Sequence, residues 1–143
     1  MKVSIKGYLL VSLAIVALCL SPLLFGQSQT KMNQDAVSEL KKVNEEMVSL
    51  YQKIVAKYSK GSEADLTFVQ KFEKAQSAWI AYRDAHLDAI FPSTTPNKYG
   101  SVQPLCVATV KTELTRSRIT QLRQWSEGVE EGDVCLGSRP TKK

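Results

Sequence analysis

The sequence predicts an all-α protein: a three-helix up-down-up bundle with a long antiparallel hairpin and a disulfide-tethered C-terminal tail. Three observations lead to this prediction. Apolar residues recur at helical spacing along most of the chain. Glycine and proline gather in a few places between the periodic stretches. Two cysteines lie on either side of the last periodic stretch. With 143 residues and no internal repeat, the chain is long enough for one compact domain.

The N-terminal segment has the layout of a secretory signal peptide. Its first residues include Lys2 and Lys6 and no acid, residues 8–25 form an apolar run, and small polar residues follow. We therefore expect residues 1–26 to be removed as a signal peptide. The product would be a periplasmic or secreted protein in which residues 27–143 form a single helical domain.

Two alternatives for this segment stay open. The apolar run is about long enough to span a bilayer, so an uncleaved segment would anchor the protein, and this would be its only membrane contact. Pro22, near the end of the run, favours a processed segment. Cys19 would permit lipid attachment, but the residue before it, Leu18, is larger than lipoprotein processing normally accepts.

Composition and charge exclude several classes of function. Loss of Lys2 and Lys6 lowers the net charge from +5 to +3, and the chain has no dense basic stripe, so nucleic acid is not an expected partner. Cys106 and Cys135 survive processing, and two thiols in an oxidising compartment favour one disulfide. A metal site would need further ligands, but His86 is the only histidine, so we expect no metal and no cofactor.

The first helix is expected over residues 33–60. Its apolar positions follow one another at the spacing of one helical face, and they are Ala36, Leu40, Val43, Met47, Leu50, Ile54 and Tyr58. A break at Gly61 ends it, and Ser62 followed by Asp65 resembles an N-cap for a second helix over residues 63–91. The inward residues expected in the second helix are Leu66, Val69, Phe72, Trp79 and Ile80. Similar lengths and a short turn imply an antiparallel hairpin.

The third helix is expected over residues 105–126, after a loop at residues 92–104 that prolines and a glycine mark. Its expected inward residues are Val110, Leu114, Leu122 and Trp125. Residues 127–143 are rich in glycine and form an irregular tail. Because Cys106 starts the helix and Cys135 lies in the tail, a disulfide would fold the tail back toward the loop. In the chain-entropy model such a bridge stabilises by roughly 3–4 kcal/mol.

The most informative local motif lies in the second helix. Gln76, Trp79 and Arg83 stand at positions i, i+3 and i+7, which places an amide, an indole and a guanidinium on one helical face. An ordinary core stripe would carry Leu or Ile there. A tryptophan on an inward face is more often a core residue than a ligand contact. The arginine is expected to pair with a carboxylate, with Glu113 or Asp84 as the candidates.

A longer pattern contains this motif. Its residues are Gln76, Trp79, Tyr82, Arg83, Asp84, Gly100, Ser101, Pro104, Leu114, Thr115, Arg118 and Leu122. In order and spacing the pattern resembles the LprI-like lysozyme inhibitor family over about residues 35–126. The resemblance implies a small, helical, exported domain related to an inhibitor of lysozyme. This chain carries Leu87 and Val110 where the family often has cysteine.

The expected function is that of an exported, lysozyme-inhibitor-like binding protein whose partner is lysozyme or another cell-wall hydrolase. We interpret six motif residues as structural: Gln76, Trp79, Tyr82, Arg83, Asp84 and Arg118. The candidate binding residues lie on the longest internal loop and in the acidic tail, and they are Tyr99, Gly100, Ser101, Glu127, Glu130 and Glu131. The plainer interpretations are turn chemistry for the loop and a solvated face for the tail. The alternative function is an envelope binding or scaffold module without lysozyme inhibition.

We do not expect an enzyme, and no catalytic residue is predicted. His86 has no nucleophile motif beside it. A glycosidase built on a carboxylate pair stays possible in principle, because any two acids can converge in a fold.

Overall fold

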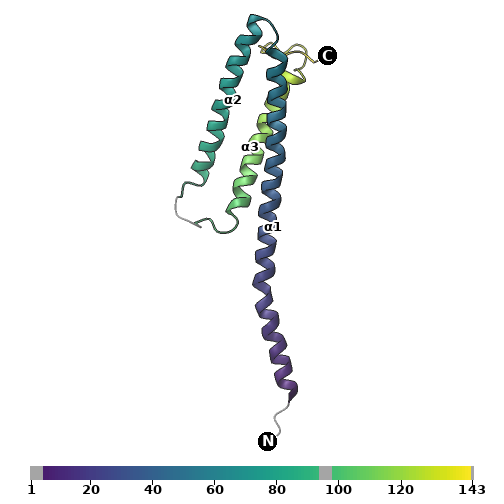
Figure 1. Ribbon diagram of the computed structural model, residues 1–143, viewed down its shortest axis with the longest axis vertical. Coiled ribbons are helices and arrows are strands. Elements are labelled where there is room, and N and C mark those ends of the chain that lie inside the picture. The colour runs from purple at the N-terminus through teal and green to yellow at the C-terminus, as the bar shows by residue number, and fades with distance from the viewer. Residues whose placement is uncertain (1–4, 94–97, 143) are drawn as a thin grey trace.

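The protein consists of three helices joined by short connections (Figure 1). A computed structural model describes the backbone of residues 5–93 and 98–142 and the side chains of residues 28–93 and 98–142. Within this part of the chain the helices are α1 (Ile5–Tyr58), α2 (Glu63–Ile90) and α3 (Gln103–Ser126). The same residues form no strand beyond one isolated bridge. The prediction of an all-α protein with three helices is therefore confirmed.

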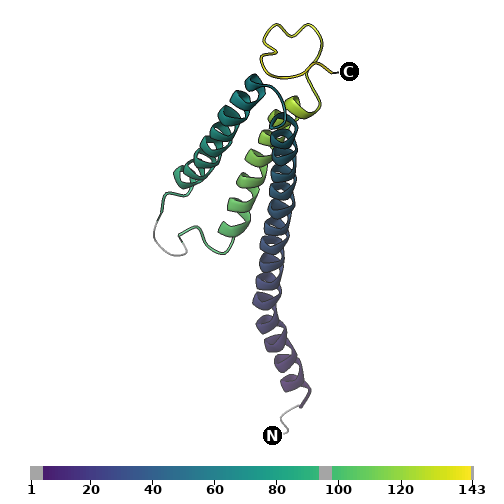
Figure 2. The same cartoon turned by 45° about the horizontal axis from the view of Figure 1, so that its top comes forward.

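The three helices run up, down and up. α1 and α3 lie side by side in the same direction, and α2 runs antiparallel to both and leans away from α1 toward its own C-terminal end (Figures 1 and 2). The predicted hairpin of the first two helices is thus present, but it is open. The closest pairing joins α1 to α3 instead.

The first helix is longer than expected, because it begins at Ile5 rather than at residue 33. Its N-terminal part projects past the ends of the other two helices (Figure 1). Contacts between residues four apart carry the helix through the predicted start: Gln29 Nε2 donates to Asn33 Oδ1 at 2.9 Å. Among the residues whose side chains are described, no helix is long and apolar enough to cross a membrane, and the apolar run 8–25 falls outside them.

The pairing of α1 with α3 is parallel and in register. Arg116 forms an ion pair with Glu39, and Arg123 Nη2 lies 2.7 Å from an Oε of Glu46. Both pairs join residues 77 apart in the chain, so the two helices advance together. The pairs are one heptad apart on each helix, which is the arrangement that flanks the seam of a parallel coiled coil.

The core lies at the end of the bundle where α1 meets α2. Its buried members are Val43, Met47, Ile54, Phe72, Ile119 and Leu122. An aromatic cluster packs against them: the ring of Phe72 lies 5.7 Å from Tyr51, 5.1 Å from Phe68 and 5.2 Å from Trp125, measured between centroids. Such pairs add to the apolar area that they bury.

The predicted inward residues are confirmed in part. In α1 the buried residues Val43, Met47 and Ile54 all belong to the predicted stripe. In α2, Leu66 and Ile80 were expected to face inward but are 46% and 38% exposed. α2 therefore buries only a narrow face, which includes Val69, Phe72 and Gln76. Buried residues that the apolar pattern missed are Gln76, Leu87, Ala108, Thr115, Arg118 and Ile119.

The turn between α1 and α2 follows the sequence signal. Ser62 is the N-cap of α2: its Oγ accepts from the backbone N–H of Asp65, and the Asp65 carboxylate accepts from the backbone N–H of Ser62 at 2.8 Å. This reciprocal arrangement satisfies two backbone donors that the first helical turn would otherwise leave unpaired. The predicted cap is confirmed.

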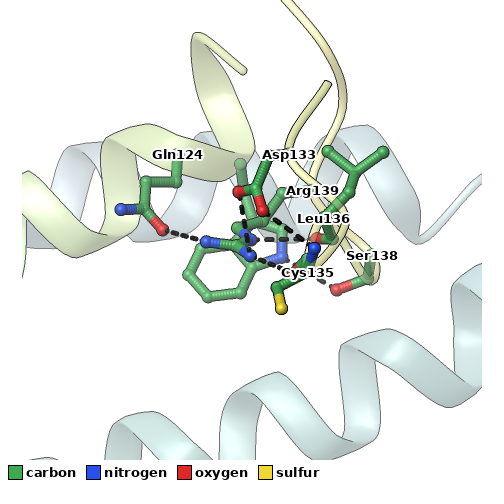
Figure 3. A network of polar contacts seen from close by, with 7 residues as sticks. Gln124, Asp133, Cys135, Leu136, Ser138 and Arg139 are labelled. Carbon is green, nitrogen blue, oxygen red and sulfur yellow. Dashed lines mark hydrogen bonds and ion pairs between the residues drawn. The ribbon is translucent and has the colours of Figure 1, made fainter. Parts of the chain in front are cut away.

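The C-terminal tail closes on itself at the far end of α3. Val129 N–H donates to the Pro140 carbonyl, and Lys142 N–H donates to the Val129 carbonyl, both at 2.8 Å. Gly128, with φ of +90°, brings the backbone so close that an added Cβ would lie 2.8 Å from Lys142 N. Arg139 holds the interior of the loop (Figure 3). The guanidinium donates to Gln124 Oε1 at 2.9 Å and to the carbonyls of residues 135 and 136.

The predicted disulfide between Cys106 and Cys135 is not present in the structure. Both residues are free thiols, one in the first turn of α3 and the other in the tail beyond its last turn. The helix between Cys106 and Ser126 rises about 30 Å. Because the tail closes on itself through Arg139 and the Val129 hydrogen bonds, it does not return along that length. The tail is therefore held by hydrogen bonds and ion pairs and not by a covalent tether.

Candidate functional site

A polar seam joins α2 to α3 in the middle of the molecule. Arg118 is only 9% exposed, and its Nε donates to Gln76 Oε1 at 3.0 Å. A terminal nitrogen of the same guanidinium donates to Gln121 Oε1 at 3.0 Å. Gln76 is 6% exposed and directs its amide nitrogen toward the sulfur of Met47 on α1. Buried polar groups are costly unless paired, so this network fixes the α2–α3 register.

A cation-aromatic group continues the seam toward the open end. The side chains of Arg83 and Arg118 both lie over the ring of Trp79. The distance from the guanidinium carbon to the ring centroid is 5.4 Å for Arg83 and 5.9 Å for Arg118. Arg83 also pairs with Asp84 at 3.0 Å, and Lys111 from α3 lies 3.5 Å from the same carboxylate. The structure therefore brings Gln76, Trp79 and Arg83 to one face, as the spacing predicted, and Asp84 is the carboxylate that Arg83 contacts.

Two carboxyl groups of α2 have shifted acidities. Burial alone would raise the pKa of Asp84, but the hydrogen bond and charge of Arg83 and the charge of Lys111 outweigh it, so the pKa lies below its ordinary value. Hydrogen bonds from the Ser62 side chain and backbone lower the pKa of Asp65. For both residues, the folded protein therefore stabilises the ionised carboxylate relative to the protonated carboxyl group.

We expect the protein to lose stability in acid through these two groups. A carboxyl whose pKa is depressed by folding stabilises above its unfolded pKa of about 3.9, and the contribution is lost as pH falls through the folded value. The urea midpoint should fall between about pH 5 and pH 2, and Asp84→Asn should flatten that fall. Asp88→Asn, an exposed carboxyl on the same helix, is the matched control. Equal effects of the two variants would contradict this assignment.

The candidate loop residues lie at the open end of the bundle. The ring of Tyr99 packs edge-on against Phe91 at 5.4 Å between centroids. Asn33 of α1 donates to the Ser101 carbonyl at 2.9 Å. Gly100 has φ of +67°, and no atom lies within 4 Å of the position that a Cβ would occupy. The described part of the loop is therefore anchored at both sides and open at its tip.

The acidic residues of the tail are largely paired within the protein. Glu130 pairs with Lys142, whose pKa is raised mainly by that hydrogen bond. Glu127 lies 3.7 Å from Arg123. Among the described residues, Glu131 is the one candidate acid of the tail without an ion pair. The dense acidic patch expected from the sequence is thus partly neutralised.

The loop and the tail do not form one surface. The expected disulfide would have brought the tail beside Tyr99 and Ser101, but the tail lies at the other end of α3 (Figure 1). That helix of 24 residues is about 36 Å long. The six candidate binding residues therefore form two separate groups.

A groove along α1 is a surface that the sequence analysis missed. It has a volume of about 510 Å³ and is lined by Val37 and Val48, which are 52% and 44% exposed, with Asn44 between them. Asn44 Oδ1 is buried without a hydrogen-bond partner in the described part of the chain. The groove was not visible in the sequence, because its apolar residues alternate with polar and charged ones on the same helical face.

The metal-binding residue types of the described chain do not gather into a metal site. No group of three or more His, Cys, Asp or Glu residues there is arranged to hold a metal ion. His86 stacks on the ring of Tyr82 at 5.6 Å between centroids. Tyr82, which is 55% exposed, thus lies outside the buried part of the motif.

The family model described as lysozyme inhibitor LprI matches residues 25–122. The chain belongs to this family. The matched range contains the polar seam, the α1 groove and the loop at Tyr99, and it ends before the tail. No curated protein and no solved structure matches the chain.

Proposed function

We propose that this protein is an exported inhibitor that binds lysozyme or a related cell-wall hydrolase. The observation that carries the proposal is the family match, which covers residues 25–122 and therefore nearly the whole helical domain. The described residues form a three-helix bundle with an anchored loop at one end. That form suits a binding protein that docks on an enzyme, and it needs no catalytic group of its own.

The contact surface that we propose is the loop at the open end, with Tyr99, Gly100 and Ser101 at its centre. This loop lies inside the family match, whereas the tail lies outside it. Tyrosine is common among the residues that dominate binding energy at protein interfaces. Glu127, Glu130 and Glu131 form a second, separate candidate surface, which salt would weaken because its attraction to a basic enzyme is electrostatic.

Inhibition of cell-wall lysis tests both the function and its place. At low salt the protein should inhibit lysozyme, and Tyr99→Ala should raise the inhibition constant by about tenfold or more. Tyr82→Ala removes another exposed tyrosine outside the loop and serves as the matched control. A full loss through Glu130→Lys/Glu131→Lys would move the site to the tail, and a loss through Val48→Lys would move it to the α1 groove.

The alternative is an envelope binding or scaffold module without lysozyme inhibition. Charge favours it: the chain carries +3 after loss of the N-terminal segment, and a basic enzyme is repelled by a basic partner. Absence of any inhibition by the unaltered protein at low salt would remove the inhibitor proposal and leave this one.

Export with cleavage of residues 1–26 is part of the proposal. It rests on the basic start, the apolar run 8–25 and the small residues that follow. Cleavage there would shorten α1 to the part that packs against α2 and α3, together with a short extension. Intact mass of the exported protein measures this directly. A mass that includes residues 1–26 would contradict cleavage and favour a membrane-anchored form.

A further inference from the structure

A groove of about 420 Å³ lies between the first half of α2, the last turns of α3 and the tail, far from the loop proposed to bind the enzyme. Its apolar wall is aromatic. Phe68, Phe72 and Trp125 line it, and their ring centroids lie 5.1 to 6.2 Å apart. Pockets for small molecules commonly have this size and an apolar lining with a few placed polar groups.

The charged groups of the groove are all cations. Lys71 and Arg118 line it and no acid does. Within the described part of the chain, no carboxylate lies within ion-pair distance of either. Arg118 is more than nine-tenths buried, and its hydrogen-bond partners are the neutral amide oxygens of Gln76 and Gln121. A buried charge without a counter-charge is unfavourable, so an anion in the groove would complete this site.

A hydroxyl group adds a third donor. Ser138 of the tail lines the groove, and its Oγ accepts a hydrogen bond from Trp125 Nε1 at 3.0 Å. Because that bond uses a lone pair of the oxygen, the hydroxyl hydrogen stays available to an acceptor in the groove. Trp125 therefore has two roles in the groove. Its ring forms part of the apolar wall, and its Nε1–H positions the Ser138 hydroxyl.

We propose that this groove binds a small amphiphile with one carboxylate on an apolar body, of the class of medium-chain fatty acids. The carboxylate meets Arg118, Lys71 and Ser138, and the apolar body lies against the aromatic wall. Hydrogen bonds between a guanidinium and a carboxylate are stronger than those that Arg118 makes to amides. The tail, whose closure by Arg139 holds Ser138 in place, then has a role in ligand binding (Figure 3).

Titration calorimetry with decanoate and with 1-decanol tests the proposal, since the two probes share a chain and differ in the charged group. Decanoate should bind at least about tenfold more tightly than the alcohol. Lys71→Glu should weaken decanoate binding by about tenfold or more while leaving the alcohol little changed. Lys74→Glu makes the same change of charge on an exposed position of α2 outside the groove and should change binding by less than about twofold.

Arg118→Met removes the buried charge directly and should abolish the preference for decanoate. If that variant does not fold, decanoate binding by Ser138→Ala and the comparison of Lys71→Glu with Lys74→Glu still test the proposal. All three of these positions are exposed, so the substitutions should leave the fold intact. No binding of decanoate, equal binding of the two probes, or equal effects of Lys71→Glu and Lys74→Glu would each overturn the proposal. The enzyme-inhibition assay is an independent readout, because the loop that carries Tyr99 follows the C-terminal end of α2, whereas the groove lies between the first half of α2, the last turns of α3 and the tail.

Discussion

Leu122→Ala is expected to destabilise the protein by about 3 kcal/mol, one of the two largest effects of a single substitution that we anticipate. Leu122 is fully buried on α3, at 0% exposure, in the cluster with Ile119 and Phe72. Truncation removes apolar contact area and leaves a cavity, and both terms oppose folding. In a domain of this size the melting temperature should fall by roughly 10 °C.

Urea unfolding followed by circular dichroism measures this loss. Leu66→Ala is the matched control: it makes the same truncation on α2, where the side chain is 46% exposed, and should cost less than about 1 kcal/mol. Similar losses for the two variants would mean that Leu122 does not belong to the core of the bundle. That result would challenge the packing on which both proposed sites depend.

The sequence predicted the buried face of α1 well, although not the start of the helix, because that face follows the simplest physical rule. Apolar residues at steps of three and four place a continuous stripe on one face, and Val43, Met47 and Ile54 are buried as that stripe requires. In α2 and α3 the rule correctly predicted the burial of Val69, Phe72 and Leu122 but missed other buried positions, in part because polar residues occupy them. A pattern that counts only apolar residues cannot place Thr115, whose hydroxyl donates to the Lys111 carbonyl at 2.7 Å within its own helix.

The tail shows the limit of counting cysteines. Two thiols in an exported chain favour a bridge on average, but the geometry of the intervening helix decides whether they meet. Here about 30 Å of α3 separates the two ends. The residue that holds the tail is Arg139. Its partners are the carbonyls of residues 135 and 136, the Gln124 amide and the Asp133 carboxylate, and no local spacing in the sequence pairs them.

Motif spacing predicted the α2 side of the polar seam but not its partner on α3. Positions i, i+3 and i+7 correctly place Gln76, Trp79 and Arg83 on one face of α2, but the partner on α3 lies 42 residues away from Gln76 along the chain. Nothing in local spacing pairs Gln76 with Arg118, because that contact depends on how the two helices are rotated against each other. The loop and the tail were predicted to lie side by side through a disulfide, and their separation came only with the fold.

Gln76→Leu is expected to cost about 3 kcal/mol, although leucine is nearly the same size and more hydrophobic. The change removes the acceptor of the Arg118 Nε–H and leaves a buried guanidinium with fewer partners. Arg118→Met alone should cost about 2 kcal/mol, because the Gln76 amide oxygen then stays buried and unpaired. Gln70→Leu, an exposed position on α2, is the matched control and should be nearly neutral.

The double variant Gln76→Leu/Arg118→Met is the decisive measurement. When both partners of a buried hydrogen bond become apolar, no unsatisfied group remains, so the double variant should lose less than the sum of the single losses by about 1.5 kcal/mol or more. Additive losses in urea unfolding would show that the two side chains act independently. The same variant should lose the preference for decanoate over decanol, because it keeps the fold and removes the buried charge. Stability and charge recognition are thus separated in one protein: the seam contributes to folding through the pairing of its members, and to binding through the cation that the pairing holds beside the groove.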